Sequence, residues 1–248
     1  MYDLIDLHCH ILSSVDDGAY DDDMMKSMLD IAYNDGIKAI CFTPHFKIHQ
    51  FKNDEHIRKY NLHIERVFSS ALEYVNEKYS DMKIYLGNEV MFHNDICNSL
   101  STGKCRFLAD SSYVLVEFKP ETPMFDIENI VSKILRKGYI PVIAHIERYS
   151  ALVNDPSKLK ELRGLGALLQ INAGSILKFW FGKTARFIKN ALKNKLVDII
   201  CTDAHNDKEL SPILSKAHDK IFKRYGEEYA KMLFFTTPNA IINNVKIY

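Results

Sequence analysis

The sequence has no excess of charge of either sign, no long apolar run and no paired cysteines. Its 248 residues include 32 basic and 32 acidic side chains, so the formal net charge is zero. This balance gives no indication of a nucleic-acid partner or of an anionic membrane surface. No apolar run approaches the roughly 18 residues that a membrane-spanning helix requires, so we expect no membrane insertion.

The cysteines exclude two further classes of protein. There are five, scattered at Cys9, Cys41, Cys97, Cys105 and Cys201. An odd number without a C-x-x-C pair argues against a disulfide framework and favours a reducing compartment. Because the N-terminus also lacks the pattern of a signal peptide, we expect a cytoplasmic protein. None of the cysteines has an arginine six residues later, which excludes the C-x₅-R mechanism of cysteine-dependent phosphatases.

Short apolar runs alternate with longer amphipathic stretches along the chain. The seven runs cover residues 4–10, 37–45, 83–90, 113–118, 139–145, 167–172 and 197–205. Helical spacing is clear over 22–36, 127–138 and 184–195, and the tail predicts two short helices. This alternation predicts an α/β fold with a parallel sheet buried on both faces, and the number of units favours a closed barrel. No linker interrupts the pattern, so we expect one domain over residues 1–248.

Polar side chains recur where the apolar runs end. Six of the seven runs carry them: His8, His10, His45, Glu89, Glu117, His145, Asp203 and His205. The carboxyl ends of the strands of a parallel barrel converge on one face, where active sites are built. By strand alternation Asp6 shares a face with His8 and His10. It either orients a ligand imidazole or makes a contact within the strands.

These residue types predict a metal centre. Imidazole and carboxylate ligands suit Mn²⁺, Fe²⁺ or Zn²⁺, and one ion takes only a few protein ligands, so a set of this size indicates two or three ions. Without metals, such a buried set would leave polar groups unpaired at high cost. In the first loop, Asp16 or Asp17 offers a further ligand, or the two form a turn with Gly18.

An arginine lies next to one of the candidate ligands. Arg148 follows His145 by three residues, and its planar guanidinium suits a phosphate group, although it could instead pair with Glu147. Multinuclear metal sites generate a metal-bound hydroxide and bind the oxygens of a transferring phosphoryl group. The combination predicts hydrolysis of a phosphoester.

The motifs resemble a known superfamily. They are HxH at 8–10, TPH at 43–45, GNE at 87–89, HIER at 145–148 and TDAH at 202–205. Together they resemble the PHP (polymerase and histidinol phosphatase) superfamily over nearly the whole chain. VDDGA at 15–19, VEF at 116–118 and DAHN at 203–206 make the chain most similar to bacterial manganese-dependent protein-tyrosine phosphatases of capsule and exopolysaccharide operons.

The resemblance implies a distorted TIM-like (βα)7 barrel of PHP type around a trinuclear centre. The implied ligands are His8, His10, Asp17, His45, Glu89, Glu117, His145, Asp203 and His205. The implied metal is Mn²⁺, with Fe, Zn or Co as alternatives according to supply. Arg148 takes the place of the arginine in the superfamily's HxER motif.

The hypothesis is a metal-dependent phosphotyrosine hydrolase. A metal-bridging hydroxide would attack phosphorus and Arg148 would stabilise the transition state, with Asp203 or His205 as candidate general acids. The expected substrate is a cognate tyrosine autokinase of polysaccharide export. Two alternatives remain open, a small-molecule phosphatase of the histidinol-phosphate type and a non-catalytic protein that binds phosphotyrosine. A nuclease would need a basic stripe that this neutral chain lacks.

Overall fold

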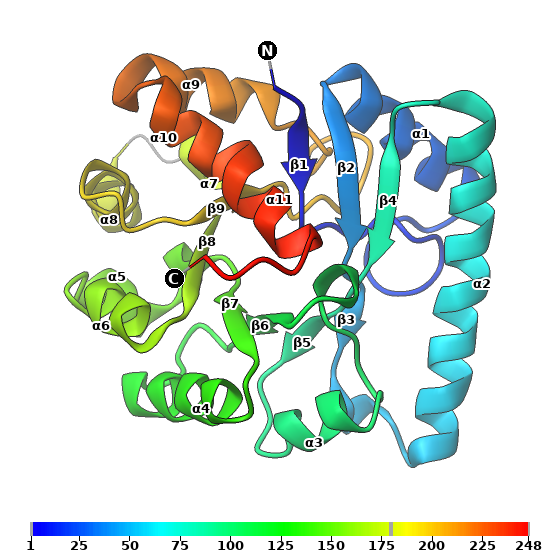
Figure 1. The fold of residues 1–248 in the computed structure, drawn as a ribbon, viewed down its shortest axis with the longest axis horizontal. Helices are drawn as coiled ribbons and strands as arrows, with labels where there is room; N and C mark the ends of the chain where they lie inside the picture. The colour runs from blue at the N-terminus through cyan, green and yellow to red at the C-terminus, as the bar shows by residue number, and fades with distance from the viewer. Residues whose placement is uncertain (1, 179–180, 248) are drawn as a thin grey trace.

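The described residues, 2–178 and 181–247 of this computed structural model, form an α/β structure (Figure 1). Its strands are β1 (Leu4–Asp6), β2 (Ile37–Phe42), β3 (His45–Phe46), β4 (Lys83–Leu86), β5 (Glu89–Met91), β6 (Tyr113–Glu117), β7 (Ile140–Ile143), β8 (Leu168–Asn172) and β9 (Ile199–Cys201). All pairings between these strands are parallel. Each of the seven predicted apolar runs contains a strand, so the prediction of a parallel α/β sheet is confirmed.

Two of the seven barrel strands are interrupted. Between β2 and β3 lie Thr43 and Pro44, and Pro44 has no backbone N–H to donate to a neighbour. Gly87 and Asn88 separate β4 from β5 at the same level. Hydrogen bonds continue across the breaks, since the backbone N–H of Glu89 donates to the carbonyl of Thr43 at 3.3 Å. Each pair of short strands therefore acts as one bent barrel strand.

The barrel closes between the beginning and the end of the chain. The N–H of Asp203 donates to the carbonyl of His8, and the N–H of His10 donates to that of Ala204, both at 2.8 Å. Cys9 and Ala204 form an isolated parallel bridge, beyond the regular strands. These contacts join the two sheets, ordered β1-β2-β4 and β3-β5-β6-β7-β8-β9, into a distorted TIM-like barrel of seven strands. The predicted fold class is confirmed.

The helices surround the barrel. They are α1 (Asp22–Asn34), α2 (Asp54–Lys78), α3 (Ile96–Ser101), α4 (Met124–Arg136), α5 (Ser150–Asn154), α6 (Lys158–Leu165), α7 (Ala173–Lys178), α8 (Gly182–Lys193), α9 (Ser215–Tyr225), α10 (Glu227–Lys231) and α11 (Thr237–Ile242). The helices predicted over 22–36, 127–138 and 184–195 correspond to α1, α4 and α8. Two short helices were also predicted in the tail, and a π-helical turn over Met232–Thr236 joins them. Among the described residues, no helix has both the length and the apolar character to cross a membrane.

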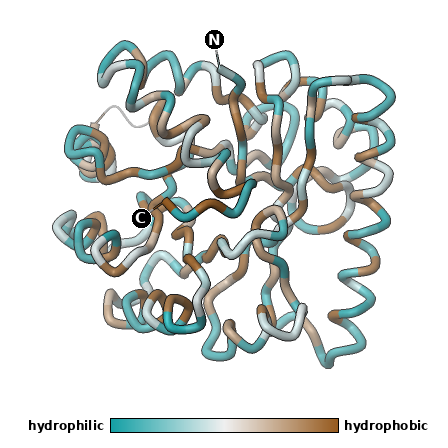
Figure 2. Tube along the Cα trace, viewed as in Figure 1, coloured by the Kyte–Doolittle hydropathy of each residue, from teal (hydrophilic) through white to brown (hydrophobic). Residues whose placement is uncertain are grey.

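Two apolar cores hold the layers together. Ile5, Leu115 and Val142 pack inside the barrel, whereas the outward-facing strand residues pack against the buried faces of the helices. Figure 2 shows the hydrophobic residues concentrated along the strands and hydrophilic ones recurring on the helices around them. Because both faces of each strand are buried, the strands appear in the sequence as almost continuous apolar runs.

The C-terminal segment covers the end of the barrel where the strands begin. Ile241 of α11 joins the interior core, and the carbonyl of Val245 accepts a hydrogen bond from the Tyr113 hydroxyl at 2.8 Å. Tyr113 is the first residue of β6. The carboxyl ends of the strands therefore lie at the opposite, uncovered end.

Asp6 does not have the position that strand alternation predicted. Its Oδ1 accepts a hydrogen bond from the backbone N–H of His8 at 3.3 Å, and its carboxylate binds the N–H and the hydroxyl of Thr202. The bond to the residue two positions later bends the chain, as in an Asx-turn, so regular pairing ends at Asp6. Leu7 faces the interior core, and the predicted alternation holds only for His8, Cys9 and His10. Of the two alternatives for Asp6, the contact within the strands is the one observed.

We expect Asp6→Ala to lower the free energy of unfolding by about 2–4 kcal/mol, because it leaves the buried donors of His8 and Thr202 without an acceptor. Asp6→Asn keeps an acceptor oxygen and should cost clearly less. Urea unfolding of the metal-free proteins measures both values. Equal costs for the two variants would contradict this role of the carboxylate.

Candidate metal centre

The predicted ligands come from every barrel strand except β8. They are His8 and His10 after β1, Asp17 in the following loop, His45 at the start of β3, Glu89 at the start of β5, Glu117 at the end of β6, His145 after β7, and Asp203 and His205 after β9. All nine lie at the uncovered end of the barrel and form one cluster of imidazoles and carboxylates. Arg148, in the 3₁₀ turn Ile146–Arg148, lies at its edge.

Glu89 occupies the centre of the cluster. Its Oε1 lies 2.8 Å from His145 Nε2 and 3.3 Å from His8 Nε2. Its Oε2 lies 2.9 Å from His45 Nδ1 and 3.4 Å from His10 Nε2. The carboxylate is almost completely buried, so both oxygens are shared among four imidazoles with little access of water.

Asp203 links the cluster to the arginine. Its Oδ1 lies 3.2 Å from His8 Nε2 and 3.5 Å from His10 Nε2, and its Oδ2 accepts a hydrogen bond from Arg148 Nη2 at 2.7 Å. Asp203 and His145 both have left-handed backbones, with φ of 54° and 30°. Left-handed residues other than glycine cost roughly 1–3 kcal/mol and concentrate at functional sites. The chain accepts this strain at two of the predicted ligands.

The two aspartates of the first loop have different positions. Asp17 Oδ1 lies 3.3 Å from His45 Nε2 and 3.8 Å from His205 Nε2, so its carboxylate belongs to the cluster. Asp16 lies behind the cluster, where its Oδ2 is 2.7 Å from His10 Nδ1 and accepts the N–H of His45. A carboxylate on the far nitrogen of an imidazole orients that ring toward a metal. The geometry favours Asp17 as the ligand and Asp16 as the carboxylate that orients His10.

Gly18 holds this loop against the first strand. A Cβ at Gly18 would lie 1.9 Å from the carbonyl oxygen of His10, so no side chain fits without moving the loop. We expect Gly18→Ala to weaken Mn²⁺ binding by about 10–100-fold, as loss of a ligand's support does. Titration calorimetry on the metal-stripped protein measures the affinity. Gly164→Ala is the matched control, because a Cβ there meets nothing within 4 Å; unchanged affinity in the Gly18 variant would contradict the prediction.

The charges within the cluster reinforce one another. Burial would raise the pKa of Glu89, but the positive charge of His8 and hydrogen bonds from the other imidazoles bring it well below its usual range. Burial opposes protonation of His45, yet the neighbouring carboxylates of Asp17 and Glu89 raise its pKa to about 9. Burial and the charge of Glu89 together raise the pKa of Glu117. Without a metal, the carboxylates and imidazoles thus stabilise one another's charges, and a bound cation would replace the protons on the imidazoles.

The residues present fit a set of divalent metal ions. Nitrogen and oxygen atoms within 4.8 Å of one another form four overlapping groups, each with three or four possible ligands. His45 Nδ1 and Glu117 Oε2 are buried and make no hydrogen bond among the described residues, although the former lies 2.9 Å from Glu89 Oε2. Two buried ligand atoms without a hydrogen-bond partner, here 3.7 Å apart, can both bind the same cation.

Comparison with known families covers almost the whole chain. The family described as "Capsular polysaccharide synthesis, CpsB/CapC" matches residues 4–243. The chain belongs to this family. It is 34% identical to the tyrosine-protein phosphatase CpsB of Streptococcus pneumoniae over 96% of this chain and 98% of that protein. It is 30% identical to the tyrosine-protein phosphatase YwqE of Bacillus subtilis, over 99% and 94% of the two chains.

Solved structures agree with the family assignment. A structure from a study of YwqE and CpsB, described there as unique metal-dependent tyrosine phosphatases, superposes with a TM-score of 0.85 at 28% identity and covers 99% of this chain and 96% of the other. A phosphotriesterase homology protein from Escherichia coli shares only the fold, with a TM-score of 0.57 at 10% identity and coverage of 97% and 98%. The resemblance predicted from the motifs is confirmed.

In this CpsB/CapC protein a cavity of about 480 Å³ adjoins the cluster. Arg148, Asn172 and Asp203 are among the residues that line it, as are Lys178 of α7 and Thr184 of α8. Arg148 pairs with Asp203, and the alternative pairing with Glu147 is not observed among the described residues. Glu147 instead accepts the N–H of Asn172 at 3.1 Å.

Three residues that contact the predicted ligands had not been predicted. Gln170 and Asn172 of β8 and Tyr149 after β7 are buried, and each contacts a predicted ligand directly. Gln and Asn carry no charge, so they do not stand out as ligands among the His, Asp and Glu residues at strand ends. The available signal was the pair of amides at the end of the one strand without a predicted ligand.

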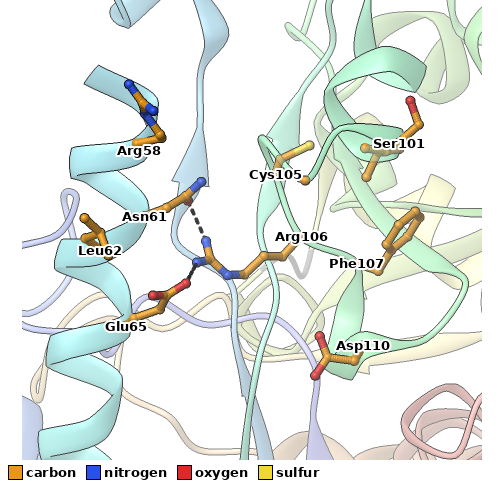
Figure 3. A pocket seen from close by; sticks show the side chains of 11 residues that line it. Arg58, Asn61, Leu62, Glu65, Ser101, Cys105, Arg106, Phe107 and Asp110 are labelled. Atoms are coloured by element: carbon orange, nitrogen blue, oxygen red, sulfur yellow. Dashed lines mark hydrogen bonds and ion pairs between the residues drawn. The ribbon is translucent and has the colours of Figure 1, made fainter. Parts of the chain in front are cut away.

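A second cavity, of about 650 Å³, lies away from the cluster between α2 and the segment before β6 (Figure 3). Arg106 projects into it and donates hydrogen bonds to Asn61 Oδ1 at 2.6 Å and Glu65 Oε1 at 2.8 Å. None of the predicted site residues lines this cavity.

Proposed function

We propose that this chain is a metal-dependent protein-tyrosine phosphatase that hydrolyses phosphotyrosine and so regulates capsular or extracellular polysaccharide synthesis. One observation carries the proposal: nine imidazole and carboxylate side chains gather at the barrel mouth with a guanidinium, Arg148, hydrogen-bonded to one of them at 2.7 Å. Family membership and the printed activity of the relatives support it.

The nine predicted ligands would hold two or three divalent ions, with Mn²⁺ as the proposed metal. Such ions, when bound, supply a hydroxide at neutral pH and neutralise the charge of a phosphoryl group. The carboxylates of Asp17, Glu89, Glu117 and Asp203 match the charge of two divalent ions. Imidazole and carboxylate ligands also accept Fe, Zn or Co, so the choice of Mn²⁺ is part of the proposal.

Arg148 would bind the phosphate and stabilise the charge on its oxygens. Its side chain is 49% exposed and lines the cavity, so a substrate can reach its free donors while Nη2 stays on Asp203. A guanidinium can present two parallel donors to a phosphate and remains charged at any physiological pH. Stabilisation of transition-state charge by fixed donors is commonly the largest single contribution to catalysis.

The leaving group needs little help from a proton donor. Burial would raise the pKa of Asp203, but the charges of His8 and His10 lower it, so this carboxyl is a poor acid. His205 donates its Nδ1 proton to the carbonyl of Asp203 at 2.8 Å and leaves Nε2 free as a ligand. Since a tyrosine leaving group has a pKa of about 10, it departs with little help from an acid. The catalytic roles proposed for Asp203 and His205 are therefore those of ligands.

The proposed substrate is the phosphotyrosine of a cytoplasmic protein, namely a cognate tyrosine autokinase of polysaccharide export. The exposure of Arg148 and of Asp17, 49% and 64%, supports a mouth open enough for a phosphotyrosine that is part of a protein. A small phosphate ester of the histidinol-phosphate type would favour a deeper, acid-lined pocket. The cytoplasmic location and the single domain over residues 1–248 stay predictions.

The test compares two substrates on metal-stripped protein before and after addition of Mn²⁺. Hydrolysis of a phosphotyrosine peptide that depends on Mn²⁺ and exceeds that of histidinol phosphate would support the proposal. Turnover of histidinol phosphate alone would move the protein to the small-molecule branch. Binding of the peptide without turnover of either substrate would favour a non-catalytic protein that recognises phosphotyrosine.

A further inference from the structure

Strand β8 supplies none of the predicted ligands, yet it ends in two buried amides at the cluster. Gln170 is completely buried and Asn172 is 5% exposed. Residues two apart on a strand share a face, and both side chains point toward ligands that come from other strands. Buried amides of this kind remain only where all their hydrogen-bonding groups have partners.

The first amide has only one orientation that satisfies its neighbours. The backbone N–H of His145 can only donate, and it lies 2.7 Å from Gln170 Oε1, so this atom must be the acceptor. His8 Nδ1 lies 3.2 Å from the same oxygen and must therefore carry a proton. The other ring nitrogen of His8, Nε2, is left to face Glu89 and Asp203 at 3.3 and 3.2 Å.

The orientation of Gln170 fixes the orientation of the second amide, Asn172. Gln170 Nε2 donates to Asn172 Oδ1 at 2.8 Å, which leaves Asn172 Nδ2 as a donor. That nitrogen donates to Asp203 Oδ2 at 2.7 Å, the same oxygen that accepts from Arg148. The other oxygen, Oδ1, is left to face His8 and His10. Every donor and acceptor in this chain of hydrogen bonds has one consistent direction.

We propose that Gln170 and Asn172 form an amide relay whose role is to position three metal ligands and the phosphate-binding arginine. The relay fixes the His8 tautomer that presents Nε2 and anchors the backbone of His145. It also reserves one oxygen of Asp203 for the cluster, and through the other oxygen it sets where Arg148 lies. The inference rests on the proposed metal centre and adds two positioning residues to it.

The relay predicts that Asn172→Ala lowers Mn²⁺ affinity beyond what a general loss of stability would cause. Asn172→Ala should lower the Mn²⁺ affinity of the metal-stripped protein by about 10–100-fold, the usual effect of removing a group that orients metal ligands. Asn61→Ala is the matched control. Asn61 also donates one hydrogen bond and accepts one, to Lys104 and from Arg106, but in the second cavity (Figure 3).

The experiment is Mn²⁺ titration calorimetry together with thermal unfolding of the metal-free variants. We expect lower affinity for Asn172→Ala, unchanged affinity for Asn61→Ala and similar losses of metal-free stability in the two. Unchanged affinity in Asn172→Ala would overturn the relay. A loss of affinity of the same size in Asn61→Ala would overturn it as well, because a general loss of packing would then account for both.

A second variant keeps the test open if Asn172→Ala does not fold. Asn172→Asp has the same shape and keeps the acceptor for Gln170, but it places an oxygen where the donor to Asp203 lies. An added negative charge alone would tighten the binding of a divalent cation, whereas loss of the donor should loosen it. Tighter binding would overturn the relay.

Glu89→Gln is measured in the same way and tests the metal centre itself. If this variant binds Mn²⁺ with normal affinity, the proposed metal centre fails, and not the relay alone.

Discussion

Glu89→Gln should abolish Mn²⁺-dependent hydrolysis of a phosphotyrosine peptide, with a loss of at least about 10³-fold in kcat/KM. The reason is the position of the carboxylate, whose two oxygens lie between 2.8 and 3.4 Å from the nitrogens of four histidines. The amide has nearly the same shape but carries no charge, and one of its two terminal atoms can no longer bind a cation. The loss should therefore appear in metal affinity as well as in turnover.

The control for this variant is Glu65→Gln. Glu65 of α2 pairs with Arg106 at 2.8 Å in the second cavity, away from the cluster, and its side chain is 58% exposed. An exposed ion pair contributes little, about 0–1 kcal/mol, so this variant should keep full affinity and turnover. If Glu89→Gln retained Mn²⁺ binding and activity, the carboxylate would not be a ligand shared by the ions.

Arg148→Ala should lower kcat/KM by about 10²–10³-fold, or roughly 3–4 kcal/mol of transition-state stabilisation. Its effect on the metal should differ from that of Glu89→Gln. Removal of a cation 2.7 Å from Asp203 Oδ2 makes the cluster more negative, so Mn²⁺ affinity should be unchanged or higher. Turnover kinetics and calorimetry on the same preparations distinguish a residue that stabilises the transition state from one that binds the metal.

A conservative replacement sharpens this prediction. Arg148→Lys keeps the charge but cannot present two parallel donors, so its activity should lie between those of the parent and of Arg148→Ala. Arg106→Ala is the matched control, since Arg106 binds Asn61 and Glu65 in the other cavity (Figure 3). Full activity of Arg148→Ala, or a comparable loss in Arg106→Ala, would remove Arg148 from the proposed mechanism.

The positions of the strands could be predicted because the barrel buries both faces of every strand. Each run is therefore mostly apolar, and the polar residues near the ends of six of the seven runs pointed to the cluster. Pro44 could be read from the sequence, but the continuation of the strand as β3 depends on its pairing with β5, which the sequence does not show. Helix α2 was not among the predicted helices, although Ile57, Ile64, Val67 and Ala71 are buried at helical spacing.

Within the site, the residue types could be predicted from the sequence and the geometry that supports them could not. His8 and Glu89 stood out because a charged group at the end of an apolar strand needs a partner. Nothing local indicates the left-handed backbone of His145 and Asp203, because contacts with distant strands impose it. Gln170 and Asn172 stayed hidden for a related reason: an amide becomes informative only when its partners are known.

The closure of the barrel through Cys9 and Ala204 has a consequence for how the protein is made. During translation, His8 and His10 leave the ribosome early, but Asp203 and His205 emerge only when most of the chain has been synthesised. Contacts between such distant parts of a sequence form late, because a long loop must close first. A nascent chain that has not emerged as far as β9 can therefore hold only part of the proposed metal site.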